Sequence, residues 1–232
     1  MFKHDVKALY DQIAEKYQQN RSKADNDYIE LPAMMNYLGS VKGKQVLDLG
    51  CGLGGHTNVL LKHGARVTAI DASQKMVGFA KAHCKNRAEF LVGNFEKVRF
   101  PEQKFDLIMA SYSIHYVKNL KPLFKRISSW LKPNGKIVFS VFHPIQYYRR
   151  VENFDFSKSA KHWFHLRSYD VDIFNWYHPL EEYLAALEEN GFELLRMKEP
   201  CLDKKIKGFH PSQYLLPSCI LFDARKKSVI HK

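Results

Sequence analysis

The stretch VLDLGCGLGGHT, residues 46–57, decides the fold of this chain. An apolar run ends in a carboxylate, four glycines follow within six residues, and a polar residue then opens an amphipathic segment. Gly50, Gly52 and Gly55 have the G-x-G-x-x-G spacing of a dinucleotide-binding turn. The stretch therefore predicts a buried strand, a tight ligand-binding turn and a helix in direct succession.

Strands and helices continue to alternate beyond this turn. Ser73 is a plausible N-cap for one helix, and Lys132-Pro133-Asn134-Gly135 is a strong turn signal after another. Such alternation predicts a parallel, doubly wound sheet. The expected strands are Gln45–Leu49, Arg66–Ile70, Glu89–Val92, Phe105–Ala110 and Lys136–Phe142, and the expected helices are Thr57–His63, Gln74–Cys84 and Leu120–Leu131.

The two ends of the chain depart from this alternation. Residues 1–40 have helical periodicity and predict an N-terminal helical cap. Residues 144–177 are rich in aromatic residues and histidine without a clear period, which suggests a lid inserted after the fifth strand. A helix at Pro179–Asn190 and strands at Glu193–Lys198 and Cys219–Ala224 complete the chain, and the two strands could pair antiparallel at one edge. We expect one α/β domain over residues 1–232, with a doubly wound, mostly parallel seven-stranded sheet and an antiparallel edge strand.

Composition narrows the class of protein. With 232 residues, 45% of them hydrophobic, the chain is long enough to bury a sizeable core. It has no long apolar run and its start lacks a secretory signal, so a cytoplasmic location is expected. Four scattered cysteines form no C-x-x-C pair, so no metal site is expected. The net charge of +12 suits acidic metabolites or nucleic acid, or serves solubility alone.

Two carboxylates beside the turn indicate the ligand. Asp71 ends the second strand, 21 residues after Gly50, where a carboxylate suits the two hydroxyls of a ribose. Asp48 precedes the turn, where it would repel a pyrophosphate by an energy on the order of a few kcal/mol. The same charge favours a ligand that carries an ammonium and a sulfonium. S-adenosylmethionine (SAM) has both cations and no phosphate, so the sequence favours SAM over NAD.

The whole set of motifs resembles the class I SAM-dependent methyltransferases of the small-molecule type. After the fourth strand the chain has SYSIHYV, residues 111–117, in place of the Asn-Pro-Pro-Tyr motif of many DNA- and glutamine-methylating relatives. The resemblance implies SAM as the cofactor and a small-molecule methyl acceptor. The segments that carry it are Val46–Thr57, Ala69–Ser73, Gly93-Asn94-Phe95, Phe105–Val117 and Leu131–Ser140, with weaker matches at Tyr177–Pro200 and Leu216–Lys226.

The resemblance also implies a set of cofactor-binding residues. Gly50 and Gly52 would approach the methionine part of SAM, Asp71 would bind the ribose, and Ala72 and Met76 would border the adenine. The full expected set is Tyr17, Arg21, Asp48, Gly50, Cys51, Gly52, Asp71, Ala72, Met76, Asn94, Phe95 and Ser111.

Three members of this set carry open alternatives. Similar proteins often have Asp where this chain has Asn94, which can still accept a hydrogen bond from the adenine amino group through its carbonyl. Phe95 could cover the purine ring or simply belong to the core. Arg21, one helical turn after Tyr17, could grip the SAM carboxylate or be a solvated surface residue.

Three histidines are the candidate catalytic residues. His115 follows the fourth strand, His143 follows the fifth, and His178 begins the late helix. An imidazole titrates near neutral pH and can take a proton from a hydroxyl or ammonium acceptor. We expect the three to converge in one pocket beside the SAM methyl group, against the alternative that these rings only pack the lid.

Three functions therefore compete with methyl transfer to an O or N atom of a small molecule. The basic charge leaves an RNA (tRNA) methyltransferase open, although no RNA-binding module is appended. A non-catalytic SAM-binding regulatory protein would keep the same cofactor residues. A nucleotide-cofactor oxidoreductase is disfavoured by Asp48. The sequence leaves the oligomeric state and the identity of the acceptor undetermined.

Overall fold

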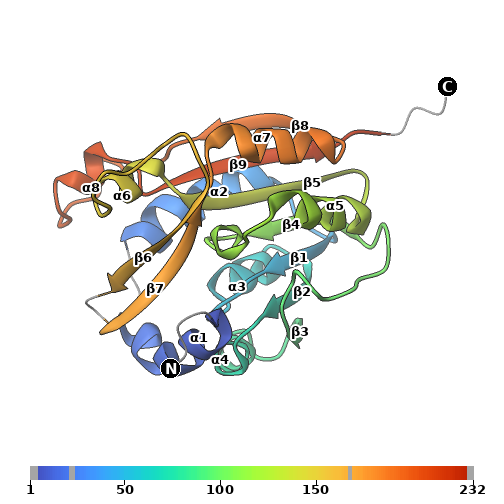
Figure 1. Ribbon diagram of the computed structural model, residues 1–232. Helices are drawn as coiled ribbons and strands as arrows, with labels where there is room; N and C mark the ends of the chain where they lie inside the picture. The colour runs from blue at the N-terminus through green and yellow to red at the C-terminus, as the bar shows by residue number, and fades with distance from the viewer. Residues whose placement is uncertain (1–4, 21–23, 167–168, 229–232) are drawn as a thin grey trace.

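The computed structural model describes residues 5–20, 24–166 and 169–228. Its main sheet has seven strands in the order β3-β2-β1-β4-β5-β9-β8 (Figure 1). This confirms the predicted doubly wound sheet, and β9 is the one strand that runs antiparallel to its neighbours β5 and β8. The strands are β1 Gln45–Leu49, β2 Arg66–Asp71, β3 Glu89–Val92, β4 Phe105–Ala110, β5 Leu131–Phe142, β8 Phe192–Lys198 and β9 Cys219–Lys226.

Alternating burial along the strands divides the core into two layers. Leu47 and Leu49 of β1 belong to one hydrophobic cluster, and Val46 belongs to the other, because successive side chains of a strand point to opposite faces. Helices α5 (Leu120–Trp130) and α7 (Leu180–Glu189) cover the first face. The second face is covered by α2 (Leu31–Leu38), α3 (Gly55–Lys62) and α4 (Gln74–His83).

The predicted turn after α5 lies inside β5. Leu131 already pairs with Phe105 of β4, and Lys136 pairs with Leu107 after a shift of register. Asn134 has a φ of 59°, the left-handed conformation that Asn tolerates in turns. The turn signal therefore marks an irregularity within one strand, and the strand begins five residues before the predicted Lys136.

The N-terminal cap consists of α1 (Val6–Asn20), a π-helical segment (Ala24–Glu30) and α2. Helix α1 lies against α4, where Ser73 Oγ and Lys75 N donate to Asp11 Oδ1. Ser73 is also the N-cap of α4, since its Oγ accepts from Met76 N at 3.1 Å. The start of α4 thus holds the cap in place over the sheet.

The segment that sequence reasoning left without structure contains a second sheet. After α6 (Pro144–Tyr148), strands β6 (Ala160–Leu166) and β7 (Val171–Tyr177) pair antiparallel as a two-stranded ribbon. Figure 1 shows this ribbon extending away from the main sheet toward α1. The loop before β9 carries a short helix, α8 (Ser212–Leu215). Both faces of the ribbon carry aromatic residues, so the alternation that marks a half-buried strand is absent from the sequence.

Among the described residues, no helix is long and apolar enough to span a bilayer.

Candidate functional site

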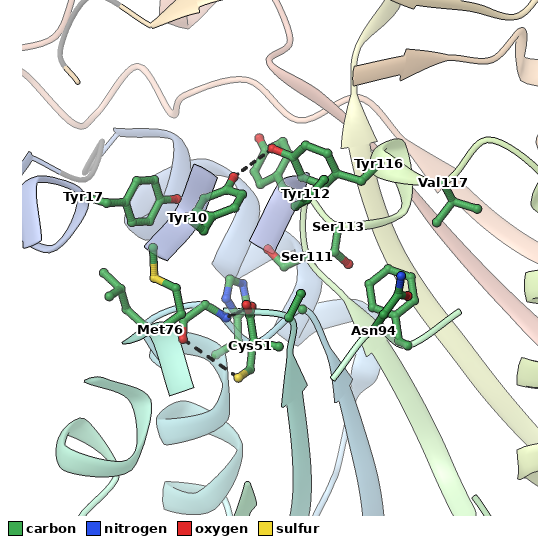
Figure 2. A pocket seen from close by; sticks show the side chains of 18 of the residues that line it. Tyr10, Tyr17, Cys51, Met76, Asn94, Ser111, Tyr112, Ser113, Tyr116 and Val117 are labelled. Atoms are coloured by element: carbon green, nitrogen blue, oxygen red, sulfur yellow. Dashed lines mark hydrogen bonds between the residues drawn. The ribbon is translucent and has the colours of Figure 1, made fainter. Parts of the chain in front are cut away.

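A cavity opens at the carboxyl ends of β1, β2, β3 and β4, under helix α1 (Figure 2). This is the edge at which open α/β sheets bind ligands. The turn after each of the four strands contributes to its wall, and α1 contributes from the cap. Its lining consists of Val6, Tyr10, Tyr17, Gly50, Cys51, Gly52, Leu53, Gly55, His56, Asp71, Ala72, Met76, Asn94, Phe95, Glu96, Ser111, Tyr112, Ser113, Tyr116 and Val117.

The glycine turn is fixed by backbone bonds to β2. The N–H groups of Gly50 and Cys51 both donate to Ile70 O, at 2.8 and 3.0 Å. Gly50 has a φ of +79°, and a Cβ added there would lie 2.5 Å from the Cβ of Ser113. Ser113 in turn donates from Oγ to Leu49 O at 2.6 Å. Only glycine fits this position, because its positive φ and the nearby Ser113 side chain leave no room for a Cβ.

Asp71 joins the turn to the start of α4. Its Oδ2 accepts from Gly52 N and its Oδ1 accepts from Ser73 N, both at 2.9 Å. Burial raises the pKa of this carboxyl group, and the two backbone N–H groups act in the opposite direction. These two hydrogen bonds hold the side chain in place at the cavity wall.

A buried ion pair supports the same turn. The Glu30 side chain is fully buried, and its Oε2 lies 2.7 Å from His56 Nε2. Ser140 Oγ donates to Glu30 Oε1 at 2.7 Å. Burial acts to raise the pKa of Glu30, but the charge of His56 and the hydrogen bonds to His56, Ser140 and Ser111 lower it overall. His56 is the one basic residue among the described residues that line the cavity.

Sequence reasoning missed both partners of this pair. His56 directly follows the glycine turn, and that position could have marked it. Glu30 has no comparable signal, because its partners are 26 and 110 residues away in the chain.

A second cavity adjoins the first, and four tyrosines line both: Tyr10, Tyr17, Tyr112 and Tyr116. The hydroxyls of Tyr10 and Tyr116 are 2.8 Å apart, and Figure 2 shows the two rings reaching toward each other above Cys51. Burial raises the pKa of Tyr10 well above its ordinary value, so both hydroxyls are neutral. The rest of the second cavity is lined by Ile29, His115, Phe142, Gln146, Arg149, Arg150, Phe164, Leu166, Tyr169, Ile173, Asn175, Ser212, Gln213, Leu216 and Ser218.

The first cavity contains most of the expected cofactor residues. Arg21 lies outside the described residues. Asp48 does not line the cavity: its side chain is 1% exposed and accepts from Thr57 Oγ1 at 2.6 Å. Asp48 therefore does not reach the cavity, because the first turn of α3 covers its carboxylate. The expected residues that do line the cavity are Tyr17, Gly50, Cys51, Gly52, Asp71, Ala72, Met76, Asn94, Phe95 and Ser111.

The three candidate catalytic histidines do not share a pocket. His143 caps α6 through Nδ1, and its Nε2 lies 2.9 Å from Glu199 Oε1. His178 is buried, with Nε2 2.9 Å from Val117 O and Nδ1 2.8 Å from Ser159 Oγ. Only His115 lines the second cavity. The structure does not bring the three rings together there, because hydrogen bonds to Glu199, Ser159 and Val117 hold the other two rings elsewhere.

Comparisons of the sequence with known proteins find a domain family and curated relatives. Residues 47–139 match a methyltransferase domain family. The chain is 38% identical over 146 residues to an uncharacterized protein of Haemophilus influenzae, which covers 58% of this chain and 57% of that protein. It is 32% identical over 157 residues to phosphoethanolamine N-methyltransferase 3 of Arabidopsis thaliana, covering 65% of this chain and 29% of that protein. The chain thus covers less than two thirds of either curated relative.

A solved structure extends the likeness over most of the chain. The S-adenosylmethionine-dependent methyltransferase of Mesorhizobium loti aligns with a TM-score of 0.69 and 27% identity, covering 84% of this chain and 96% of that one. The strand order, the glycine turn bonded to β2 and the matched domain family agree on one conclusion. Residues 47–139 match a methyltransferase domain, and the fold is the Rossmann-like fold of the SAM-dependent methyltransferases.

Proposed function

We propose that the protein transfers the methyl group of SAM to an oxygen or nitrogen atom of a small molecule. The observation that carries this proposal is the wall of four tyrosines shared by the two cavities. We assign the cofactor to the first cavity, called the cofactor cavity below, and the small molecule to the second, called the acceptor chamber. A methyl transferase must bring donor and acceptor together across one narrow boundary, with water kept out. The relative from Arabidopsis, by its name, methylates nitrogen in a small phosphorylated amine.

The residues of the first cavity fit SAM. Asp71 offers a fixed carboxylate to the ribose hydroxyls, and Ala72 and Met76 offer an apolar surface to the purine. We assign the SAM carboxylate to His56, the one basic side chain in the described lining, which is held beside the buried Glu30. Asp48 contributes through its field alone, because Thr57 and α3 separate it from the cavity.

When bound, SAM supplies a methyl group made electrophilic by the sulfonium. The acceptor's lone pair would form the new bond to the methyl carbon as the C–S bond breaks with its electron pair left on sulfur, and the acceptor's proton would pass to water. Aromatic rings attract cations, so a wall of four tyrosines favours a sulfonium at this boundary. Helix α1 closes the cavity over the turn, and its bonds to Ser73 and Tyr116 keep it there.

Two measurements test this proposal. Transfer of label from methyl-labelled SAM to a metabolite library should identify an acceptor of low molecular mass. Binding of SAM without transfer to any compound would contradict the proposed activity. Retention of RNA, with an affinity that falls steeply with salt, would indicate an RNA acceptor instead.

The cofactor assignments have their own test by calorimetry. Asp71→Ala should weaken SAM about tenfold, the scale of a hydrogen bond to a charged acceptor. His56→Gln should weaken SAM by a similar factor but leave 5′-methylthioadenosine, which lacks the carboxylate, unaffected. Equal losses for both ligands would remove His56 from the carboxylate site.

A further inference from the structure

Two residues that line the acceptor chamber each carry a buried polar atom that lacks a hydrogen-bond partner. These atoms are Nδ1 of His115, on the turn after β4, and Oδ1 of Asn175, on β7. The two residues are 1% and 2% exposed. Leaving such an atom buried and unpaired destabilises the fold. Two residues of this kind lining one cavity, from segments 60 residues apart, indicate a site that a polar ligand group completes.

His115 takes part in this site as a neutral ring. Its imidazole lies between the rings of Tyr116 and Phe142, with centroids 4.5 and 4.8 Å away. Burial there lowers its pKa to about 3. A neutral imidazole forms a hydrogen bond with a hydroxyl or an amine, and it does not provide a positive charge for an anion.

The positive charge of the chamber lies at its mouth. Arg149 and Arg150, which follow α6, are exposed, and both also line a neighbouring surface hollow with Trp163 and His165. The described lining of the chamber includes no carboxylate side chain. An acceptor that enters here therefore meets two guanidinium groups outside and neutral polar groups inside.

From this arrangement we infer that the methyl acceptor is a small acidic molecule with a hydroxyl or amine at its opposite end. Its carboxylate or phosphate binds Arg149 and Arg150 at the mouth, and its hydroxyl or amine bonds to Asn175 Oδ1 and His115 Nδ1 beside the shared tyrosines. The inference rests on the proposed methyl transfer and specifies its substrate class. Asn175 and the two arginines, none of which the sequence pattern marks, become specificity-determining residues.

The test uses acceptor pairs that differ only in the acidic group. Phosphoethanolamine is compared with ethanolamine, and 4-hydroxybenzoate with 4-hydroxybenzyl alcohol, within a wider set built the same way. With labelled SAM, the acidic member of a turned-over pair should have at least about tenfold higher kcat/KM. Acceptors found mainly among the neutral members would overturn the inference while leaving the proposed function intact. Cofactor binding without transfer to any member would instead contradict the proposed function.

Variants of the chamber residues then test which side chain binds which part of the acceptor. The double variant Arg149→Gln/Arg150→Gln should raise KM for the acidic member about tenfold, with kcat nearly constant, because the arginines bind ground state and transition state alike. The neutral member should keep its KM. Arg99→Gln removes an exposed arginine that lines neither cavity, and it should change nothing.

Asn175 is tested with a conservative rescue. Asn175→Leu should lower kcat/KM about tenfold, and Asn175→Asp, which keeps an acceptor oxygen, should restore most of the activity towards an amine. Thermal unfolding shows whether each variant is folded. An unchanged acidic preference in the folded arginine variant, or full activity in a folded Asn175→Leu, would refute the assignment.

Discussion

The two cavities meet at the same four tyrosines but are built by different means. Turns after consecutive strands β1 to β4 form the cofactor cavity, and backbone bonds such as those from Gly50 and Cys51 to Ile70 fix their geometry. The acceptor chamber is formed by side chains from segments as far apart as Tyr10 and Ser218. A site made of turns tolerates little change in its backbone. A site made of distant side chains can change its ligand without changing the fold.

The largest effect should follow a change to the cofactor turn. Gly50→Ala places a Cβ 2.5 Å from Ser113 Cβ at a φ of +79°, so the turn has to move. SAM affinity should fall about 100-fold by calorimetry, since both strain and displacement act on the binding surface. Gly78→Ala is the matched control. Gly78 lies in α4 with open space around its added Cβ, and this change should stabilise the fold by up to about 1 kcal/mol. Equal SAM affinity in both variants would contradict the claim that the cofactor cavity, unlike the acceptor chamber, depends on the backbone geometry of its turns.

Comparable in size is the effect of Asp48 on stability. Burial raises its pKa from 3.8 to about 6, so the folded protein holds a proton there that the unfolded chain loses near pH 4. Stability should therefore fall as pH rises from about 4 to about 6. Asp48→Asn removes the buried charge and still accepts from Thr57, so it should be more stable than wild type by about 3 kcal/mol at pH 7 and by little at pH 4.

Urea unfolding at several pH values measures this difference. Glu188→Gln, at an exposed position of α7, serves as the control and should give a constant difference from wild type. A pH-independent difference for Asp48→Asn would show that the carboxylate ionises normally.

A chamber side chain should affect activity and stability in opposite directions. His115→Phe keeps a ring between Tyr116 and Phe142 and removes an unpartnered nitrogen, so the fold should gain about 1 kcal/mol. Acceptor turnover should fall about tenfold, while affinity for S-adenosylhomocysteine stays at the wild-type value. A loss of cofactor affinity would mean that the two cavities are not independent in binding.

The smallest effect is expected at the edge of the cofactor cavity. Asn94 is exposed, and its Oδ1 already accepts from Glu96 N at 2.7 Å. Asn94→Asp adds a second acceptor oxygen with charge, so SAM binding should improve by up to about threefold in calorimetry, a gain limited by solvent screening. Asn94→Leu should weaken it. Equal affinity in all three proteins would place the adenine elsewhere.

The same contrast explains what the sequence could predict. Strands β1, β3 and β4 have the predicted bounds, and the turns that follow them line one cavity, because a parallel sheet brings strand ends together wherever helices intervene. His143 and His178 also lie near strand and helix ends. Their positions depend on Glu199 and Ser159, partners that no local pattern indicates. The ribbon β6–β7 was missed for a related reason, since its pairing is fixed by the residues it faces and not by a period of its own.

Within the described residues, β6 and β7 pair only with each other, so no strand pairing links the ribbon to the main sheet. Residues added or removed in pairs across β6 and β7 would lengthen or shorten the chamber wall without shifting any strand of the seven. Tolerance to insertion depends on the backbone bonds that a change disturbs. The β6–β7 ribbon can therefore be exchanged to change the wall of the acceptor chamber, while the main sheet and the cofactor cavity stay the same.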